Sequence, residues 1–210
     1  MKKSIAAGAL IAMASYLFLK ADAPLGAIFF GFALSFVCLY QLDLFTGKIG
    51  YFGEKDFAFI KILIGNFIGA GIVCILLRWN AGMIETAVAL AEKKAALPWY
   101  IALINGIFCG VLMYLAVNSW NKGFHAGCFL CVTVFILCGF EHSIADFAYM
   151  AYAWVWSINL LWILLGNAVG AVAARLLVHE NAPFFNMTNK PKNGSKGAAQ
   201  KSYPLDKQVS

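Results

Sequence analysis

The residues best suited to do chemistry stand side by side at Glu141 and His142, inside a stretch that is otherwise apolar. No charged residue occurs between Cys128 and Cys138, or between Phe147 and Arg175. A carboxylate and an imidazole are costly to place in hydrocarbon, so such residues are by default functional. Histidine also changes its charge near neutral pH. The pair therefore predicts proton chemistry coupled to transport across a membrane.

The composition indicates an all-α membrane protein. Apolar residues make up 62% and charged residues 12% of the 210 residues, against about 45–50% and about 25% in soluble domains. Asn159, with Trp154 and Trp156 beside it, predicts an interfacial turn between the last two spans, because tryptophan favours that depth. Runs of about 20 apolar residues span a bilayer, and we expect six such segments, at 4–20, 25–42, 57–78, 98–119, 124–155 and 156–178.

An internal repeat relates the two halves of the chain. Since three spans per half is an odd number, the second copy must have inverted topology, as in transporters whose site lies near the midplane. The repeat rests on three matches: Gly8 with Gly106, Thr46 with His142, and Gly-Asn-x-x-Gly at 65–69 with the same pattern at 166–170.

Two interruptions fall at corresponding places, Asp43–Lys48 in the second segment and Gly139–Ser143 in the fifth. Broken backbone at membrane depth is tolerated only where it lines a cavity or is buried in protein. The glycines of the paired motif are expected to pack helices closely. Asn66 and Asn167 are expected either to satisfy the freed backbone of the broken helices or to line the path.

The basic residues predict the orientation and a tail. Twelve of the sixteen Lys and Arg residues fall on the side that holds both termini, so the positive-inside rule puts both termini in the cytoplasm of an inner (plasma) membrane protein. Residues 181–210 have five lysines and no apolar period, which predicts a disordered basic tail after a channel domain at 1–180. The net charge of +6 is then topological and needs no nucleic-acid partner.

These motifs resemble the formate/nitrite transporter family from about Gly8 to Glu180. The resemblance rests on Asp43-Leu44-Phe45-Thr46-Gly47, Gly139-Phe140-Glu141-His142-Ser143-Ile144-Ala145, the two Gly-Asn-x-x-Gly elements, and Gly106-Ile107-Phe108-Cys109 followed by Leu115-Ala116-Val117. It implies a homopentamer in which each protomer has its own pore and an aquaporin-like shape.

The resemblance also implies roles for single residues. The implied substrate pathway contains a central histidine, a nearby threonine, two apolar constrictions, an asparagine and a vestibular lysine, here His142, Thr46, Leu44, Phe140, Asn167 and Lys94. Support for the broken helices is expected from Glu141, Asp43 and Asn66, and the nearest candidate for a second, cytoplasmic lysine is Lys3. The chain departs from the family pattern at Asp146, where the family often has Asn, and at Gly110 after Cys109.

The expected function is movement of small monovalent anions of weak acids, with formate the first choice and nitrite or hydrosulfide next. His142 would either hand over a proton or hold the anion as imidazolium, and Lys94 would draw anions into the vestibule. Asp146 is a candidate second proton site. Which anion is physiological, and whether the protein is a channel or a proton-coupled transporter, stay open.

Two other classes compete with this interpretation. An aquaporin-like pore for neutral solutes would show two Asn-Pro-Ala loops, but neither Asn66 nor Asn167 is followed by Pro-Ala. A membrane enzyme or redox subunit would need paired histidines or clustered cysteines on a soluble face. The six cysteines lie in apolar runs, Cys128-x-x-Cys131 included, and are expected to pack helices. We therefore expect neither catalysis nor a cofactor or metal.

Overall fold

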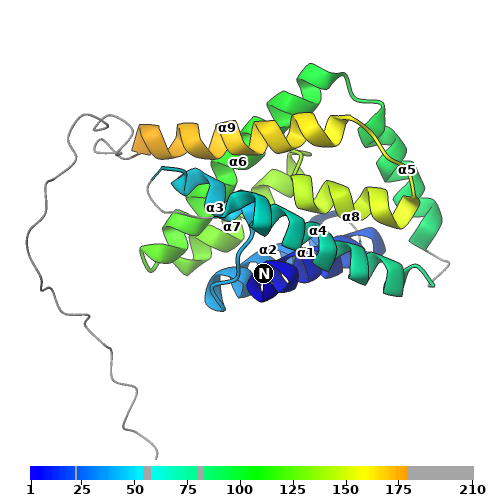
Figure 1. Cartoon of the computed structure of the whole chain (residues 1–210), viewed down its shortest axis with the longest axis horizontal. Helices are drawn as coiled ribbons and strands as arrows, with labels where there is room; N and C mark the ends of the chain where they lie inside the picture. Colours follow the sequence, from blue (N-terminus) through cyan, green and yellow to red (C-terminus); the bar gives the residue numbers. More distant parts are fainter. Residues whose placement is uncertain (22, 54–57, 80–82, 179–210) are drawn as a thin grey trace, which may run out of the picture.

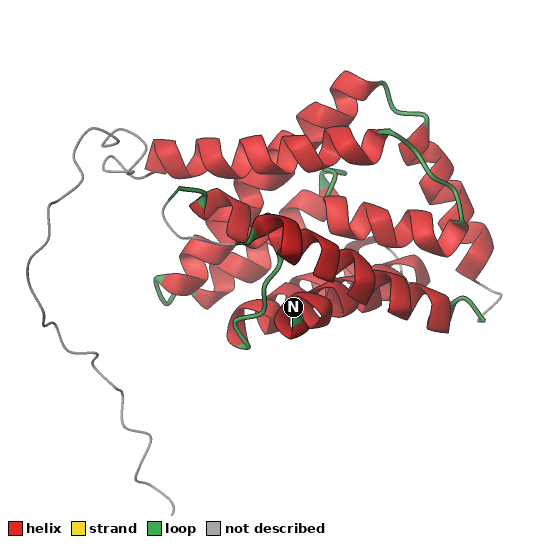
Figure 2. Ribbon diagram, in the orientation of Figure 1, coloured by secondary structure: helices red, strands yellow, loops and turns green. Residues whose placement is uncertain are grey.

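The computed structural model describes residues 1–178 apart from 22, 54–57 and 80–82, and every regular element in that part is a helix (Figure 2). The predicted tail at 181–210 and its boundary with the channel domain lie outside the described residues. By length and composition, four helices could cross a membrane: α1 (Lys2–Lys20), α4 (Phe59–Leu77), α6 (Trp99–Asn121) and α9 (Asn159–Val178).

The remaining elements are shorter. Two apolar helices, α2 (Ala23–Leu39) and α7 (His125–Leu137), each end in a break that a short helix follows. The short helices are α3 (Phe45–Lys48), which continues into the 3₁₀ turn η1 (Ile49–Tyr51), and α8 (Ser143–Ala153). A further helix, α5 (Ile84–Ala95), joins α4 to α6. Figure 1 shows α9 along one side of the molecule, α1 along the other, and α8 between them.

Glycines let the long helices pack in two close pairs, α1 on α4 and α6 on α9. A Cβ built on Gly69 would lie 1.9 Å from the carbonyl oxygen of Ile5, and one on Gly170 would lie 1.9 Å from that of Ile107. No side chain fits at such a distance. The packing role expected for the paired glycines is therefore confirmed.

Contacts of the same kind show which residues of the first helix pair correspond to which residues of the second. A Cβ on Gly8 would lie 1.9 Å from the carbonyl oxygen of Asn66, and one on Gly110 would lie 2.3 Å from that of Asn167. Gly110 therefore takes the place in the second pair that Gly8 takes in the first. The predicted match of Gly8 with Gly106 was wrong by one helical turn.

Each short helix packs against the long helices of the other half. α3 contacts α6 and α9, α8 contacts α1 and α4, and α2 packs against α7. The two breaks are thereby brought together inside the bundle, although about 100 residues separate them in the chain. Sequence position alone would not have placed them in contact.

The helix boundaries agree with five of the six predicted segments to within three residues. The predicted segment 124–155 is two helices, α7 and α8, separated at 138–142 where the break was expected. The helix α5 lies between the predicted segments 57–78 and 98–119 and was not predicted. Its signal was Ala87 and Ala91, two small residues about one helical turn apart that are buried within it, a spacing typical of a helix.

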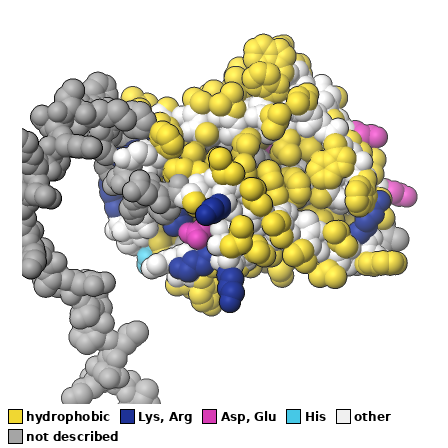
Figure 3. Space-filling view, viewed as in Figure 1, with side chains coloured by type: hydrophobic (Ala, Val, Ile, Leu, Met, Phe, Trp, Pro, Cys, Tyr) yellow, Lys and Arg dark blue, Asp and Glu magenta, His cyan; other side chains and the backbone are white. Residues whose placement is uncertain are grey.

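The surface is consistent with a lipid environment. On the face drawn in Figure 3, hydrophobic side chains cover the middle, and most Lys, Arg, Asp and Glu side chains lie toward the two ends. Large apolar side chains along the long helices are exposed, including Ile64, Ile68, Ile72 and Ile75 on α4. A row of isoleucines facing outward along α4 is expected of a helix in contact with acyl chains or a neighbouring subunit.

Candidate transport site

The first break is held by one amide side chain. Asn66 on α4 accepts a hydrogen bond on Oδ1 from the backbone N–H of Phe45 at 2.8 Å. Its Nδ2 donates to the carbonyl oxygens of Asp43 and Ser4, each at 2.8 Å. The side chain is fully buried. It satisfies the backbone groups that α2 and α3 leave free, which membrane burial requires.

The second break is held in the same way. Asn167 on α9 accepts on Oδ1 from the backbone N–H of Ser143 at 2.8 Å. Its Nδ2 donates to the carbonyl oxygens of Glu141 at 2.8 Å and Gly106 at 2.9 Å. Asn167 is fully buried and lines neither of the two cavities described below. It supports its broken helix as Asn66 does, and its predicted place in the substrate pathway stays a prediction.

We call the hydrogen bonds made by the side chains of Asn66 and Asn167 the two clamps. They show which residues of the first break correspond to which residues of the second. Leu44 lies between the bonded groups of Asp43 and Phe45, and His142 lies between those of Glu141 and Ser143. Leu44 and His142 are both extended N-cap residues, with φ and ψ of −97° and 127° and of −110° and 112°. Leu44 is thus the counterpart of His142, and the predicted equivalence of Thr46 with His142 was wrong.

Thr46 nevertheless meets His142. Its Oγ1 lies 2.8 Å from Nε2 of the imidazole, and both side chains are buried. The other ring nitrogen, Nδ1, accepts a hydrogen bond from the backbone N–H of Ala145 at 3.2 Å. The ring also stacks on Phe135, with 5.7 Å between the ring centres. His142 therefore caps α8 with one nitrogen and joins the two halves with the other.

Two cavities lie at this contact. The His142 cavity has a volume of about 330 Å³, and its wall includes Phe140, Glu141, His142 and Lys94. The Leu44 cavity has a volume of about 470 Å³, and its wall includes Leu44, Lys48 and Cys38. His142 is in the wall of the His142 cavity, and it is hydrogen-bonded to Thr46, which lies two residues after Leu44.

The two apolar residues predicted as constrictions lie on different cavities. Leu44 is buried in the wall of the Leu44 cavity. Phe140 lines the His142 cavity and stacks on Phe108, with 5.2 Å between ring centres. Their role as constrictions stays a prediction.

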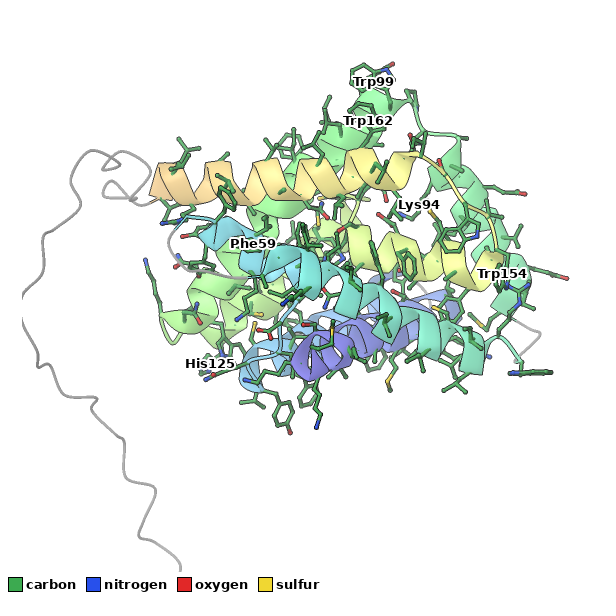
Figure 4. All side chains as sticks on the ribbon, in the orientation of Figure 1. Phe59, Lys94, Trp99, His125, Trp154 and Trp162 are labelled. Carbon is green, nitrogen blue, oxygen red and sulfur yellow. The ribbon has the colours of Figure 1, made fainter. Side chains whose placement is uncertain are left out.

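Lys94 is paired with two carboxylates. It reaches from the last turn of α5 toward α8 (Figure 4), and its Nζ contacts Asp146 Oδ1 at 2.8 Å and also Glu141 Oε2. Burial disfavours the ammonium, but the charges of Asp146 and Glu141 outweigh that effect and raise the pKa of Lys94 above its ordinary value. Lys94 is thus a paired cation in the cavity wall, and its predicted attraction of anions stays a prediction.

Other polar groups hold this cluster in place. Asn159, at the start of α9, donates from Nδ2 to the carbonyl oxygens of Lys94, Ala95 and Leu97 at 3.2, 3.2 and 2.7 Å. It satisfies the end of α5 and so fixes the backbone that carries Lys94. Asn159 was predicted only to mark a turn. That turn is confirmed, because α8 ends at Ala153 and α9 begins at Asn159.

Glu141 and Asp43 support their breaks through the main chain. The carbonyl oxygen of each accepts from a clamp asparagine. Their carboxylates are engaged elsewhere, that of Glu141 with Lys94 and that of Asp43 with Lys48 at 3.5 Å. The side chain that caps α8 is that of His142.

Five of the six cysteines lie within helices, as expected. Cys138 is the exposed C-cap residue of α7, so the packing role expected of it was wrong. Cys128 is buried, and its sulfur lies 3.8 Å from that of Cys38 on α2. Within the part of the chain that the structure describes, no group of three or more His, Cys, Asp or Glu side chains is arranged to hold a metal ion.

Comparison with known proteins places this arrangement in a family. The family model for the formate/nitrite transporters matches residues 1–180. The chain belongs to the formate/nitrite transporter family. The nitrite transporter NirC of Escherichia coli (strain K12) is 30% identical over 175 residues, covering 68% of this chain and 65% of that protein. The uncharacterized transporter YwcJ of Bacillus subtilis (strain 168) is 32% identical over 157 residues.

Solved structures of the formate/nitrite transporter family share the fold. An FNT family ion channel superimposes with a TM-score of 0.76 at 24% identity, covering 86% of this chain and 88% of that one. A pentameric formate channel with formate bound superimposes with a TM-score of 0.70 at 22% identity, covering 84% and 93%. The chain matches just under two thirds of the length of its NirC relatives. At these identities the structures establish the fold of this chain.

Proposed function

We propose that the protein carries small monovalent anions of weak acids across a membrane, with formate first and nitrite or hydrosulfide next. The observation that carries the proposal is His142, buried in a cavity wall and hydrogen-bonded to Thr46 from the other half of the protomer. The names of relatives support the substrate class, since one is a nitrite transporter and another a formate channel.

The hydrogen bonds of His142 favour a neutral imidazole. Because Nδ1 accepts the N–H of Ala145, the proton of a neutral ring is on Nε2, which then donates to Thr46 Oγ1. An imidazolium would carry a proton on Nδ1 and lose this cap. It would also face the positive end of α8. The geometry supports a neutral His142 that donates from Nε2 over an imidazolium that holds the anion.

A neutral donor suits a weak acid better than a bare anion. Even lenient insertion scales assign a charge at the membrane centre about 2.5–3.5 kcal/mol. Around His142 the walls are formed largely by apolar groups such as Phe135, Phe30 and Ala145. A substrate that accepts a proton before this point avoids most of that penalty. The Nε2–H can then bond its oxygen in place of Thr46.

We also propose how the protein assembles and how it is oriented in the membrane. The matched clamps of Asn66 and Asn167 support two inverted halves with broken second and fifth spans. The pentameric formate channel of similar fold supports a homopentamer with one aquaporin-like pore in each protomer. The count of basic residues supports an inner (plasma) membrane location with both termini in the cytoplasm. The protein would exchange protons as well as anions, with the lipid bilayer and its own copies as its other partners.

Uptake by proteoliposomes tests the role of His142. In His142→Phe, uptake of labelled formate or nitrite driven by a proton gradient should fall to background, while the oligomer stays intact by size exclusion. His142→Asn is the matched control, because asparagine is a strong N-cap that can still accept from Ala145. It should also lose proton-linked uptake, since its shorter side chain places no N–H at the position of Nε2, which faces Thr46.

Two results would contradict the proposal. Uptake at the wild-type rate and pH dependence in His142→Phe would remove His142 from the mechanism. Rapid passage of uncharged small solutes, with no weak-acid uptake at any pH, would instead favour the aquaporin-like alternative.

A further inference from the structure

The wall of the His142 cavity contains more buried acids than buried bases. Glu141 and Asp146 both contact Nζ of Lys94, and the side chains of the three are only 5%, 2% and 13% exposed. Lys93 also lines the cavity but is exposed, so its charge is solvated. With both carboxyl groups ionised the cluster would hold one negative charge without a partner. Burying an unpaired charge is strongly unfavourable.

One oxygen of the cluster has no partner. Asp146 is 1% exposed, and its Oδ1 contacts Lys94 at 2.8 Å. Its Oδ2 is buried and has no hydrogen-bond partner among the described residues. An unsatisfied buried acceptor costs about 1–3 kcal/mol, and more when it is charged. A proton on the carboxyl pair would remove both the excess charge and much of this penalty.

Among the residues that the structure describes, no second buried cation compensates for Asp146. The charged or titratable groups around it are Lys93 and Lys94 on α5, Glu141 in the break, His142 and Tyr149 on α8, and Cys109 on α6. Of these only Lys93 and Lys94 are cations, because the cap holds His142 neutral. Lys94 also lies over the ring of Tyr149, with Nζ 5.6 Å from its centre.

The other helices packed on α8 place their titratable groups farther along it. Tyr16 on α1 packs on Tyr152, with 5.9 Å between ring centres. Cys74 and Arg78 on α4 bond the carbonyl oxygens of Ala148 and Tyr152. On α9, Arg175 bonds the carbonyl oxygen of Phe52 in the other half. The balance at Asp146 is therefore set by Lys94 and Glu141.

We propose that Glu141 and Asp146 share one proton, and that this carboxyl pair protonates the anion in the His142 cavity before it reaches Thr46. The proposal rests on the proposed function. In the step, the O–H bond of the carboxyl group breaks, an O–H bond to the anion forms, and the neutral acid moves on. The pair then regains a proton from water at the rim, where Lys93 and Gly139 are exposed. His142 stays neutral throughout.

The proposed proton donor depends on the aspartate at position 146 of this chain. The family pattern often has asparagine at this place, and an amide holds no exchangeable acid proton. With asparagine there, Lys94 and Glu141 would form a simple neutral pair. The single change to aspartate adds the second carboxyl group, and with it the stored proton.

The test compares Asp146→Asn with the wild type in proteoliposomes, by uptake of labelled formate and nitrite against external pH. At acidic pH the two should transport at similar rates, because free protons suffice. At neutral and mildly alkaline pH the variant should fall several-fold below the wild type, because its donor is gone. A variant with a purely structural defect would instead lose uptake by the same factor at every pH.

Asp43→Asn is the matched control. It removes a carboxylate that pairs with Lys48 at 3.5 Å, beside the Leu44 cavity. It should leave the pH profile unchanged. Infrared spectroscopy provides a second measurement that does not depend on transport. The wild type should show the C=O stretch of a protonated carboxylic acid, which shifts in D₂O and disappears in both Asp146→Asn and Glu141→Gln.

The outcomes separate the inference from the proposed function. If the wild type transports with a pH dependence that Asp146→Asn reproduces, the carboxyl pair is not the donor. Absence of a protonated carboxyl band in the wild type overturns the inference even if the variants do not fold. If the wild type moves no weak acid but the band is present and lost in the variants, the shared proton stands and the transport proposal fails.

Discussion

The two breaks of this molecule have the same backbone and different chemistry. In each, a buried asparagine from a long helix bonds one N–H and two carbonyl oxygens, and the residue between the bonded groups caps a short helix. That residue is Leu44 in the first break and His142 in the second. The support is present in both breaks, but only the second break has a titratable capping residue.

The surroundings of the breaks differ in the same way. Beside His142, the buried Lys94 contacts two buried carboxylates. Beside Leu44, Asp43 and Lys48 form one partly exposed pair, each about a quarter exposed. A solvated pair of this kind contributes little to stability, whereas the buried cluster depends on its balance of charge. The His142 side therefore has the groups needed for proton transfer.

The largest expected effect comes from removing a clamp. Asn66→Ala and Asn167→Ala would each leave one backbone N–H and one carbonyl oxygen of a break unbonded, at about 1–3 kcal/mol per group. The third partner, the carbonyl oxygen of Ser4 or Gly106, lies inside a long helix. Both variants should lower the unfolding temperature of the purified protein strongly and by similar amounts. Asn118→Ala, which removes an amide on α6 outside both clamps, should change it little. Heating followed by size exclusion measures this.

The same two variants also test whether a clamp affects transport as well as stability. In protein that remains folded, Asn167→Ala should lose more uptake than Asn66→Ala, because it frees the backbone on either side of His142. If Asn66→Ala is stable and Asn167→Ala is not, the two clamps do not share one role, and the comparison fails.

A smaller effect is expected from the glycines of the long helix pairs. Gly69→Ala and Gly170→Ala each bring a Cβ to within 1.9 Å of a carbonyl oxygen, and such overpacking costs about 1–3 kcal/mol. We expect equal losses of thermal stability, since the two contacts match. Gly71→Ala is the control, because a Cβ there meets nothing within 4 Å. Unequal losses at Gly69 and Gly170 would show that the two pairs are packed differently.

The sequence predicted the class, the breaks and the central pair, because these depend on local signals. Long apolar runs, and polar or glycine residues interrupting them, are visible without a structure. The role of Asn167 could not be decided, because an amide in an apolar segment fits either a backbone clamp or a path. The register between halves was misread because α6 has glycines at both 106 and 110, one turn apart.

The charge cluster was less accessible to sequence reasoning. Lys94 is 47 residues from Glu141 in the chain, and its contact depends on α5, which was not predicted as a helix. Asn159 then ties the end of α5 to the start of α9. A lysine that could be read as a free vestibular cation is thus paired by packing between distant segments. Such pairing follows from tertiary structure, and no local pattern encodes it.

The smallest expected effect concerns the bond between the halves. Thr46→Val keeps the shape of the side chain but removes the hydroxyl group that bonds Nε2 of His142. One such bond contributes about 1 kcal/mol, so uptake should change about fivefold. Thr46→Ser keeps a hydroxyl group and should stay close to wild type.

The control for Thr46 is its counterpart in the other short helix, Ile144, which lies two residues after His142 as Thr46 lies two after Leu44. Ile144→Val removes one buried methylene group, at about 0.5–1.5 kcal/mol of stability, and leaves the bond between Thr46 and His142 in place. It should therefore lower the unfolding temperature slightly and leave the pH dependence of uptake unchanged. If Ile144→Val altered transport and Thr46→Val did not, the contact between the halves would serve packing alone. The proposed passage at His142 would then have to work without Thr46.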